Sequence, residues 1–557
     1  MKKQTLYITA TIVLFLGIAL AIQFVSPNIA DPDGMYHITH AKIYLENGIF
    51  YNEFPWVQFS VIKDLKTDLW YGFHLFLIPF NFFANRIFGV KLAGAIIAFA
   101  TLLMFFWALK RLKINYAVMW VLMFIVSAPD VLYRLTMTRP HNLSLGLAML
   151  TLSFGFSGGA WPIFFISATG AFLHLALAWL PVLIILIISC VNFRFRRSFG
   201  GRNSDPENHL SIDRNQMFSG VGAVRKIQKL NIEWKKILAV FGGAVFGLLL
   251  RPNPLGALKL FYIQVIQLSV VKMKGIPLIF GRELKPSEAM GFLRQILPVL
   301  LIVLVLAYVF IKIRKKVPAE TRQDWTMRIY SALTLTAIFT LIAQFMMRRS
   351  YDLMNGFGIF TIALIATAYI AYLGSQKKIS SDYIPQTKKR IILAGLVIIV
   401  MLAVNSMPLA YSYMKSAWSP TYLKDVSQWL KENTKPGDIV FNSRWDYFGG
   451  LFFWNQQNYY INGMDPIFAY SKSEELYWES HFIAADVGYT NTCEKIRCVK
   501  EEIIQTNESL LKHFNSSYLI LRLIQNPKTY FYWLQDPNYE LVFDNKKEAV
   551  FRVLPLE

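Results

Sequence analysis

The chain has 557 residues and a mass of 64.1 kDa; 55% of its residues are hydrophobic and only 17% are charged. This composition is too apolar for a soluble globular protein or a disordered chain, so it indicates a protein of the lipid bilayer. The formal net charge is +22. Residues 1–411 contain 42 basic and 17 acidic side chains, whereas residues 412–557 contain 15 and 18, so the positive excess belongs to the apolar part.

The positions of the basic residues exclude nucleic acid as a partner. Basic residues gather in short segments beside apolar runs, which is the positive-inside pattern of membrane proteins. No basic stripe interleaved with aromatic residues and no nucleic-acid-binding motif is present. We therefore expect the basic segments on the cytoplasmic side: Lys2 with Lys3, and residues 110–113, 193–236, 312–328 and 376–390.

Apolar runs of about 20 residues are long enough to cross the hydrocarbon core as helices. The sequence predicts eleven spans, at 6–25, 89–109, 115–131, 142–158, 161–174, 177–192, 237–251, 291–313, 328–346, 355–374 and 390–411. Two alternatives stay open: residues 161–192 form one bent helix, and the aromatic stretch 70–84 supplies a further span. The run 6–25 lacks a small-residue cleavage pattern after it and is interpreted as a retained anchor.

An odd number of spans after a cytoplasmic N-terminus places the C-terminal residues outside the cell membrane. We expect residues 1–411 to form a transmembrane catalytic domain with a long first outer loop at 26–88, and residues 412–557 to form an extracytoplasmic α/β domain. Cys493 and Cys498 could form a disulfide in an oxidising compartment, with two free thiols as the alternative. Residues 452–466 are predicted to form a strand, a turn and a strand.

The first outer loop opens with carboxyl and imidazole groups close to the bilayer, where ionisable side chains are costly and tend to be functional. If a helix begins near Asp33, then Asp33, His37 and His40 share one face. Such a face could take a proton from an acceptor hydroxyl, or bind a divalent metal ion beside a phosphate leaving group. The alternative is an amphipathic surface helix capped by Asp31, with solvated histidines.

Other outer loops carry arginines, which indicate an anionic ligand. Guanidinium groups suit bidentate binding of phosphate, and two adjacent arginines in a short outer loop oppose the positive-inside bias, so we predict a lipid phosphate at Arg348 and Arg349. Contacts with ordinary phospholipid headgroups are the alternative. The loop residues concerned are Arg134, Arg139 and His141, then Arg251, and finally Arg348, Arg349 and Tyr351.

The order of residues after the first span resembles the GT-C superfamily of membrane glycosyltransferases, which includes oligosaccharyltransferase catalytic subunits, protein O-mannosyltransferases and aminoarabinose transferases. The resemblance implies a sugar donor linked to polyprenyl phosphate or diphosphate, and transfer on the outer face. It implies that Asp33, with Asp31 beside it, is a base or metal ligand, and that Arg348 and Arg349 meet the lipid phosphate. The residues that carry it are Asp31, Asp33, Tyr36, Ala41, Leu45 and Gly48.

Two further segments resemble the superfamily more weakly. Arg139 and His141 stand where the second outer loop of the family carries an acid or polar residue. Arg444, Trp445, Asp446 and Tyr447 are similar to the Trp-Trp-Asp-Tyr-Gly acceptor motif of oligosaccharyltransferase, which implies recognition of a peptide sequon. A buried structural tryptophan with a capping aspartate is the alternative.

The sequence therefore predicts a polytopic α-helical membrane enzyme of the GT-C fold, in the plasma or inner membrane, that transfers a sugar from a polyprenyl-phosphate donor to a glycan, lipid or protein acceptor. An oligosaccharyltransferase-like enzyme and a non-catalytic transporter or flippase of lipid-linked saccharide are the rival hypotheses. A divalent metal, Mg or Mn, is a candidate cofactor held by Asp33 and His37. The predicted catalytic residues are Asp33, Asp31, His37 and His141, and the predicted substrate-binding residues are Arg139, Arg348, Arg349, Tyr351, Arg251, Trp445 and Asp446.

Overall fold

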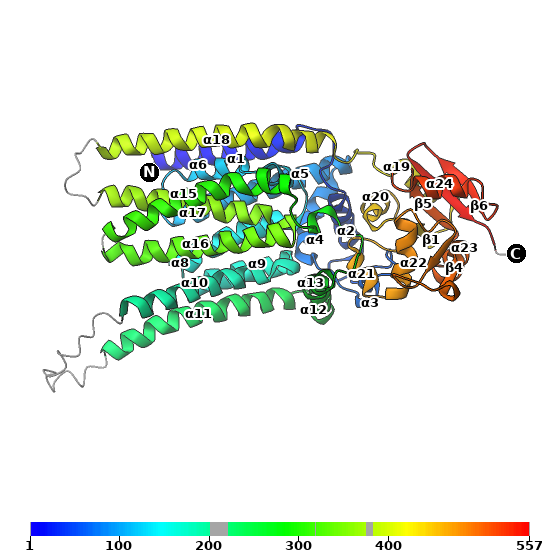
Figure 1. Cartoon of the computed structure of the whole chain (residues 1–557), viewed down its shortest axis with the longest axis horizontal. Helices are drawn as coiled ribbons and strands as arrows, with labels where there is room; N and C mark the ends of the chain where they lie inside the picture. The colour runs from blue at the N-terminus through cyan, green and yellow to red at the C-terminus, as the bar shows by residue number, and fades with distance from the viewer. Residues whose placement is uncertain (1, 201–220, 318, 375–382, 556–557) are drawn as a thin grey trace.

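The computed structural model describes residues 2–200, 221–317, 319–374 and 383–555. Long helices form a bundle at one end of the molecule, and a smaller α/β region lies at the other end (Figure 1). The long helices are α1 Lys2–Phe24, α5 Arg86–Arg111, α8 Pro140–Ser157, α9 Ala160–Leu173, α10 Trp179–Gly200, α11 Val221–Leu249, α15 Leu297–Ile313, α16 Ala319–Phe345, α17 Tyr351–Gly374 and α18 Tyr383–Lys415.

Eight helical segments within the described ranges are long and apolar enough to cross a bilayer. The chain is therefore a multi-pass membrane protein. These segments are Gln4–Phe24, Arg86–Arg111, Leu175–Arg194, Pro254–Met273, Ala289–Lys316, Arg322–Phe345, Arg348–Leu373 and Pro385–Lys415.

The segment predicted as a span at 115–131 is broken. It forms α6 Ala117–Ile125 and α7 Pro129–Arg134, because Ala128 precedes a proline and is extended, with φ −155° and ψ 150°. Nine helical residues rise only about 14 Å, which is less than half of the hydrocarbon core. Segment 254–273, which lies between the predicted spans 237–251 and 291–313, contains α12 Pro254–Phe261 and α13 Leu268–Met273 at the end of the bundle nearest the α/β region (Figure 1).

The structure contains neither a single bent helix over residues 161–192 nor a further span over residues 70–84. Helices α9 and α10 are separate, with a single 3₁₀ turn between them, and the aromatic stretch 70–84 contains only α4 Tyr71–Leu77 and a short 3₁₀ helix. The start of α1 lies at the end of the bundle away from the α/β region (Figure 1). The basic segments 193–236 and 376–390 fall partly outside the described residues, and the cytoplasmic location of this end stays a prediction.

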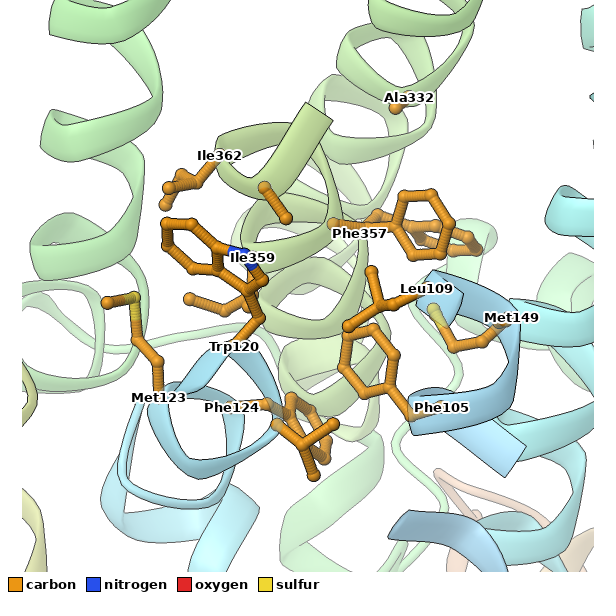
Figure 2. Packing of buried hydrophobic residues seen from close by; sticks show 14 of the residues in the cluster. Phe105, Leu109, Trp120, Met123, Phe124, Met149, Ala332, Phe357, Ile359 and Ile362 are labelled. Atoms are coloured by element: carbon orange, nitrogen blue, oxygen red, sulfur yellow. The ribbon is translucent and has the colours of Figure 1, made fainter. Parts of the chain in front are cut away.

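The bundle core is a continuous apolar cluster centred on α17, which is buried along most of its length. Figure 2 shows Phe357, Ile359 and Ile362 of α17 among side chains from α5, α6 and α8. Since α8 and α17 also carry polar residues at the end of the bundle nearest the α/β region, their packing sets the spacing of those residues.

The α/β region contains a five-stranded mixed sheet in the order β2-β1-β5-β7-β6, in which β1 is parallel to β2 and β5 while β7 is antiparallel to β5 and β6. Its strands are β1 Ile439–Asn442, β2 Tyr459–Tyr460, β5 Tyr518–Arg522, β6 Tyr539–Asp544 and β7 Glu548–Val553; β3 Asn491–Cys493 and β4 Ile503–Gln505 form a separate hairpin. Its helices are α19 Lys424–Asn433, α20 Phe448–Trp454, α21 Pro466–Tyr470, α22 Glu474–Ala484, α23 Thr506–Glu508 and α24 Pro527–Trp533.

One prediction for this region is confirmed and one is wrong. Cys493 and Cys498 form a disulfide. The segment 452–466 is not strand, turn and strand, because its first three residues complete α20 and only β2 is extended. Phe452 and Phe453 are fully buried, so tertiary packing decides the local structure against the β preference of aromatic residues.

The first outer loop and the α/β region pack together. The loop runs parallel to β2: Gln58 donates its backbone N–H to Tyr460 O at 2.8 Å, and Tyr460 donates to Trp56 O at 2.9 Å. Helix α2, Asp33–Asn47, packs against α20 so closely that a Cβ on Gly449 would lie 2.6 Å from the backbone oxygen of Pro32. The position of α2 therefore depends on both parts of the chain.

Replacing Gly449 by Ala is expected to separate α20 from the start of α2, because the added methyl group meets backbone rather than a flexible side chain. Overpacking of this kind costs about 1–3 kcal/mol. Thermal unfolding of the purified protein in detergent measures the loss. Gly159→Ala is the control, since nothing lies within 4 Å of its added Cβ. Equal melting temperatures for the two variants would contradict the close approach.

Candidate functional site

The start of α2 brings two carboxylates to the end of the bundle nearest the α/β region. The segment before it is fixed at Ile29, which exchanges backbone hydrogen bonds with Trp418, and by Lys91, whose ammonium group donates to Asn28 O at 3.1 Å. Asp31 accepts from the backbone N–H of Asp33 at 3.1 Å. The helix begins at Asp33 as predicted, with Pro32 at the N-cap position.

Arg139 is the shared partner of three carboxylates from distant parts of the chain. Its guanidinium contacts both carboxylate oxygens of Asp31, lies 2.8 Å from Asp33 Oδ2, and donates to Glu283 Oε1 at 2.9 Å. Arg139 precedes Pro140, the first residue of α8, in an extended conformation. One rigid fork of donors therefore holds α2, α8 and the segment that carries Glu283 together.

Glu283 links this cluster to two further arginines. Arg134 Nη1 lies 3.2 Å from Glu283 Oε2, and Arg349 Nη1 lies 3.9 Å from Glu283 Oε1. Burial opposes ionisation of Glu283, but Arg139, Arg349 and Arg134 together hold its pKa well below the ordinary range. Glu283 was not among the predicted site residues. The only sequence signal was its place in an outer segment, because its three partners come from distant elements.

Asp33 is the most open acid of the cluster. Its side chain is 36% exposed, whereas that of Asp31 is 4% exposed. Desolvation raises the pKa of Asp33 to about 7, with Asp31 and Glu283 adding to the rise while Arg139 and Arg349 oppose it. An accessible carboxyl group with a pKa near neutrality is suited to accept a proton.

His141 lies deeper, in the first turn of α8. It is buried, neither ring nitrogen has a hydrogen-bond partner, and Nε2 lies 4.0 Å from Asp352 Oδ2. Asp352, in the first turn of α17, lies 3.3 Å from Arg134 Nε. His141 is thus next to the cluster through Asp352 and Arg134.

The α/β region supplies a fourth acid, Asp465, and holds the segment that carries Glu283. Asp465 caps α21 by accepting from Ile467 N at 3.1 Å. Burial raises the pKa of Asp465 to about 7; the cap and Arg349 oppose the rise, and Glu283 adds to it. Trp445 donates its indole N–H to Ile279 O at 2.8 Å and lies over Gly281. The segment leading to Glu283 is therefore held by the α/β region.

Several predicted site residues have other partners. His37 belongs to a second, buried cluster, where its Nδ1 bonds His74 Nε2 at 2.8 Å. Arg251 donates through both Nη atoms to backbone carbonyls, those of Asp68, Ala171 and Phe172, so it ties the first outer loop to the end of α9.

The two arginines predicted to bind phosphate, Arg348 and Arg349, have different surroundings. Arg348 is paired with Glu288 and donates to Pro286 O at 3.1 Å, while Tyr351 is buried and bonded to Ser287 at 2.6 Å. Arg349 has its nearest carboxylate at 3.9 Å and a side chain 27% exposed. Of the pair, Arg349 is the one that keeps donors for a ligand.

The residues similar to the acceptor motif are engaged within the protein. Trp445 is bonded to Ile279, and Asp446 lies 3.2 Å from the guanidinium of Arg444. Trp445 is half-buried and Asp446 makes no capping hydrogen bond, so recognition of a peptide sequon stays a prediction.

Asp33 and His37, the predicted metal ligands, lie in separate clusters. Asp31 and Asp33 are both bound to Arg139, and His37 Nδ1 is bound to His74. Within the described ranges, neither Asp33 nor His37 belongs to a group of three or more His, Cys, Asp or Glu side chains close enough to share an ion. The guanidinium of Arg139 places positive charge beside both carboxylates, and a metal ion held by Asp33 stays a prediction.

Comparison with solved structures identifies the fold. The archaeal oligosaccharyltransferase AglB from Archaeoglobus fulgidus, solved with an inhibitory peptide and a dolichol-phosphate, aligns with 95% of this chain and 71% of its own, with a TM-score of 0.52 and 13% identity. The chain has the GT-C fold. ArnT from Cupriavidus metallidurans, in the apo state, is also similar, with 98% of both chains covered, a TM-score of 0.49 and 12% identity. No protein-family model and no curated sequence matches.

Arg139→Gln is expected to destabilise the protein by about 3–5 kcal/mol, because it leaves Asp31, Asp33 and Glu283 without their common partner. Arg349→Gln is the matched control and should cost less than about 1 kcal/mol, since its nearest carboxylate is 3.9 Å away. Thermal unfolding in detergent measures both. A larger loss of stability for the Arg349 variant would contradict the central role of Arg139 in the cluster.

Proposed function

We propose that this protein is a glycosyltransferase that takes a sugar from a polyprenyl-phosphate-linked donor and transfers it to an acceptor on the extracytoplasmic side of the membrane. The observation that carries the proposal is the convergence of Asp33 and Arg349 on one ion-pair cluster at the end of the bundle, joined through Arg139 and Glu283. The GT-C fold supports it, since solved members with this fold include an oligosaccharyltransferase.

The chemistry needs a base and a fixed positive charge. The acceptor oxygen or nitrogen attacks the anomeric carbon, the bond from that carbon to the phosphate oxygen breaks, and the phosphate leaves with the bonding electrons. Asp33 accepts the proton of the acceptor on its carboxylate. Arg139 and Asp31 hold Asp33 in place.

Arg349 would bind the phosphate of the donor. Its guanidinium is held in the cluster by Coulomb attraction to Glu283 at 3.9 Å, so its donors stay available for a bidentate contact. A lipid-linked phosphate would reach it from the end of α16 and α17, where Arg349 lies in the short connection between the two helices. His141 and Asp352 lie behind it and would orient Arg134 and, through Glu283, Arg349.

The rival functions differ in what happens to the donor. A transporter or flippase moves the lipid-linked sugar without breaking its bond to phosphate, whereas an oligosaccharyltransferase-like enzyme places glycan on sequon peptides. The partners of Trp445 and Asp446 inside the protein give no support to the peptide acceptor. The acceptor is left open among glycan, lipid and protein.

Asp33→Asn is expected to lower transfer by about 10²- to 10⁴-fold, because the amide cannot accept the proton. The assay uses purified protein in liposomes with a radiolabelled polyprenyl-phosphate sugar and membrane extract as acceptor source, and it measures release of sugar from the carrier. For the native protein, the rate should rise as the pH increases through about 7, since only ionised Asp33 is a base.

Asp64→Asn is the control for this experiment, because Asp64 lies in the same outer loop and pairs with Lys472 away from the cluster. Carrier that returns with its sugar intact from the native protein would favour transport. Undiminished transfer by a folded Asp33→Asn protein would remove Asp33 from the mechanism.

Arg349→Gln is expected to raise the KM for the lipid-linked donor by about 10- to 100-fold, since a hydrogen bond to a charged group contributes about 1.5–3 kcal/mol. The KM for the acceptor should stay the same. Arg282→Gln is the matched control, because Arg282 is an exposed arginine one residue before Glu283. Donor KM values that are equal for the two variants would contradict the phosphate contact.

A further inference from the structure

A second polar cluster lies beneath the first outer loop, and the proposed sugar transfer does not use it. It contains His40 from α2, Asp68 from the loop before α4, and His74 from α4, all of them buried. The nearest oxygen of the Asp68 carboxylate lies 2.6 Å from His74 Nδ1 and 3.8 Å from His40 Nε2. We propose that these three side chains bind one divalent transition-metal ion of the zinc class.

The donor set and its spacing fit such an ion. Two imidazole nitrogens and one carboxylate oxygen are the ligands that Zn²⁺ prefers when cysteine is absent. Zinc bonds of about 2.0–2.2 Å in a tetrahedron place the ligand atoms roughly 3.3 Å apart. The three ligand atoms already lie within 4.8 Å of one another. One distance, 2.6 Å, is shorter than the zinc spacing and another, 3.8 Å, is longer, so small side-chain rotations would bring all three atoms to the ion.

The polar atoms that do not face the ion have partners that orient the ligands. His40 Nδ1 is bonded to Tyr36 OH at 2.9 Å, which leaves Nε2 to face Asp68. His74 Nε2 is bonded to His37 Nδ1 at 2.8 Å, and Asp68 Oδ1 accepts from Trp70 N at 2.8 Å. Outer partners of this kind fix ring orientation and raise ligand basicity in metal sites.

The cluster is also accessible. A small surface hollow, with room for about one water molecule, is lined by His40 and Asp68. Its wall includes Tyr44, which donates to Asp68 Oδ2 at 3.0 Å, and Glu53, which is paired with Lys66. The hollow gives an ion a path of entry and leaves room for water as a fourth ligand.

The ion would have a structural effect that can be measured without assaying the proposed sugar transfer. His40 belongs to α2, whereas Asp68 and His74 belong to the end of the same outer loop, so a shared ion links two segments of that loop. His37, one turn before His40 on α2, is bonded to His74 and is therefore held by the same cluster. Bound zinc would consequently stabilise the first outer loop.

The test uses the full-length protein in detergent, stripped with a chelator, desalted and titrated with Zn²⁺ by calorimetry, with metal content measured by mass spectrometry. We expect one Zn²⁺ per chain and a melting temperature several degrees higher. We also expect the visible absorption of four-coordinate Co²⁺ when cobalt replaces zinc. Native protein that takes up no stoichiometric ion would overturn the proposal without any variant.

Variants locate the ion. His40→Gln and His74→Gln should each lose zinc binding at micromolar metal, whereas His174→Gln, a buried histidine bonded to Ser144, should keep it. A second group of potential ligands, Glu479, Glu494 and His513, lies in the α/β region, so His513→Gln is the decisive control. Zinc lost from the His513 variant and retained by the His40 variant would place the ion in the α/β region and contradict the proposal.

Discussion

The site depends on the sharing of one guanidinium among three carboxylates. The carboxylates of Asp31, Asp33 and Glu283 would repel one another in a setting with little water. Arg139 forms an ion pair with each of them and so offsets this repulsion. Its rigid fork can satisfy several oxygens at once, which a lysine could not do with the same geometry. Because the three acids come from separate elements, the pairing that neutralises them also sets the positions of α2, α8 and the Glu283 segment.

The α/β region helps to position the residues of the site. It adds the backbone of the first outer loop to the edge of its sheet at Tyr460, and it holds the segment before Glu283 through Trp445. Asp465 of the same region interacts electrostatically with Arg349 and Glu283. A substrate at Arg349 would therefore meet groups from both parts of the chain, so a change in either part alters the geometry of the site.

Local patterns in the sequence predicted local structure well. The apolar runs, the helix beginning at Asp33 and the disulfide were recognisable because each depends on neighbouring residues. The partners of Glu283, His37 and Arg251 were not, since each lies far along the chain and becomes a neighbour only through packing. The short α6 and the helical start of residues 452–466 show the same limit, because burial against distant side chains outweighs local preference.

Helix α2 illustrates why shared spacing is not shared function. Asp33, His37 and His40 lie on one face, as their spacing requires, but seven residues of helix separate the ends of this set by about 10 Å. Asp33, at the first turn, meets Arg139 at the edge of the bundle, whereas His37 and His40 lie under the outer loop beside His74 and Asp68. A short, well-buried helix thus contributes to two separate clusters, and its rigidity couples them: whatever orders the histidine end also fixes the direction in which Asp33 points.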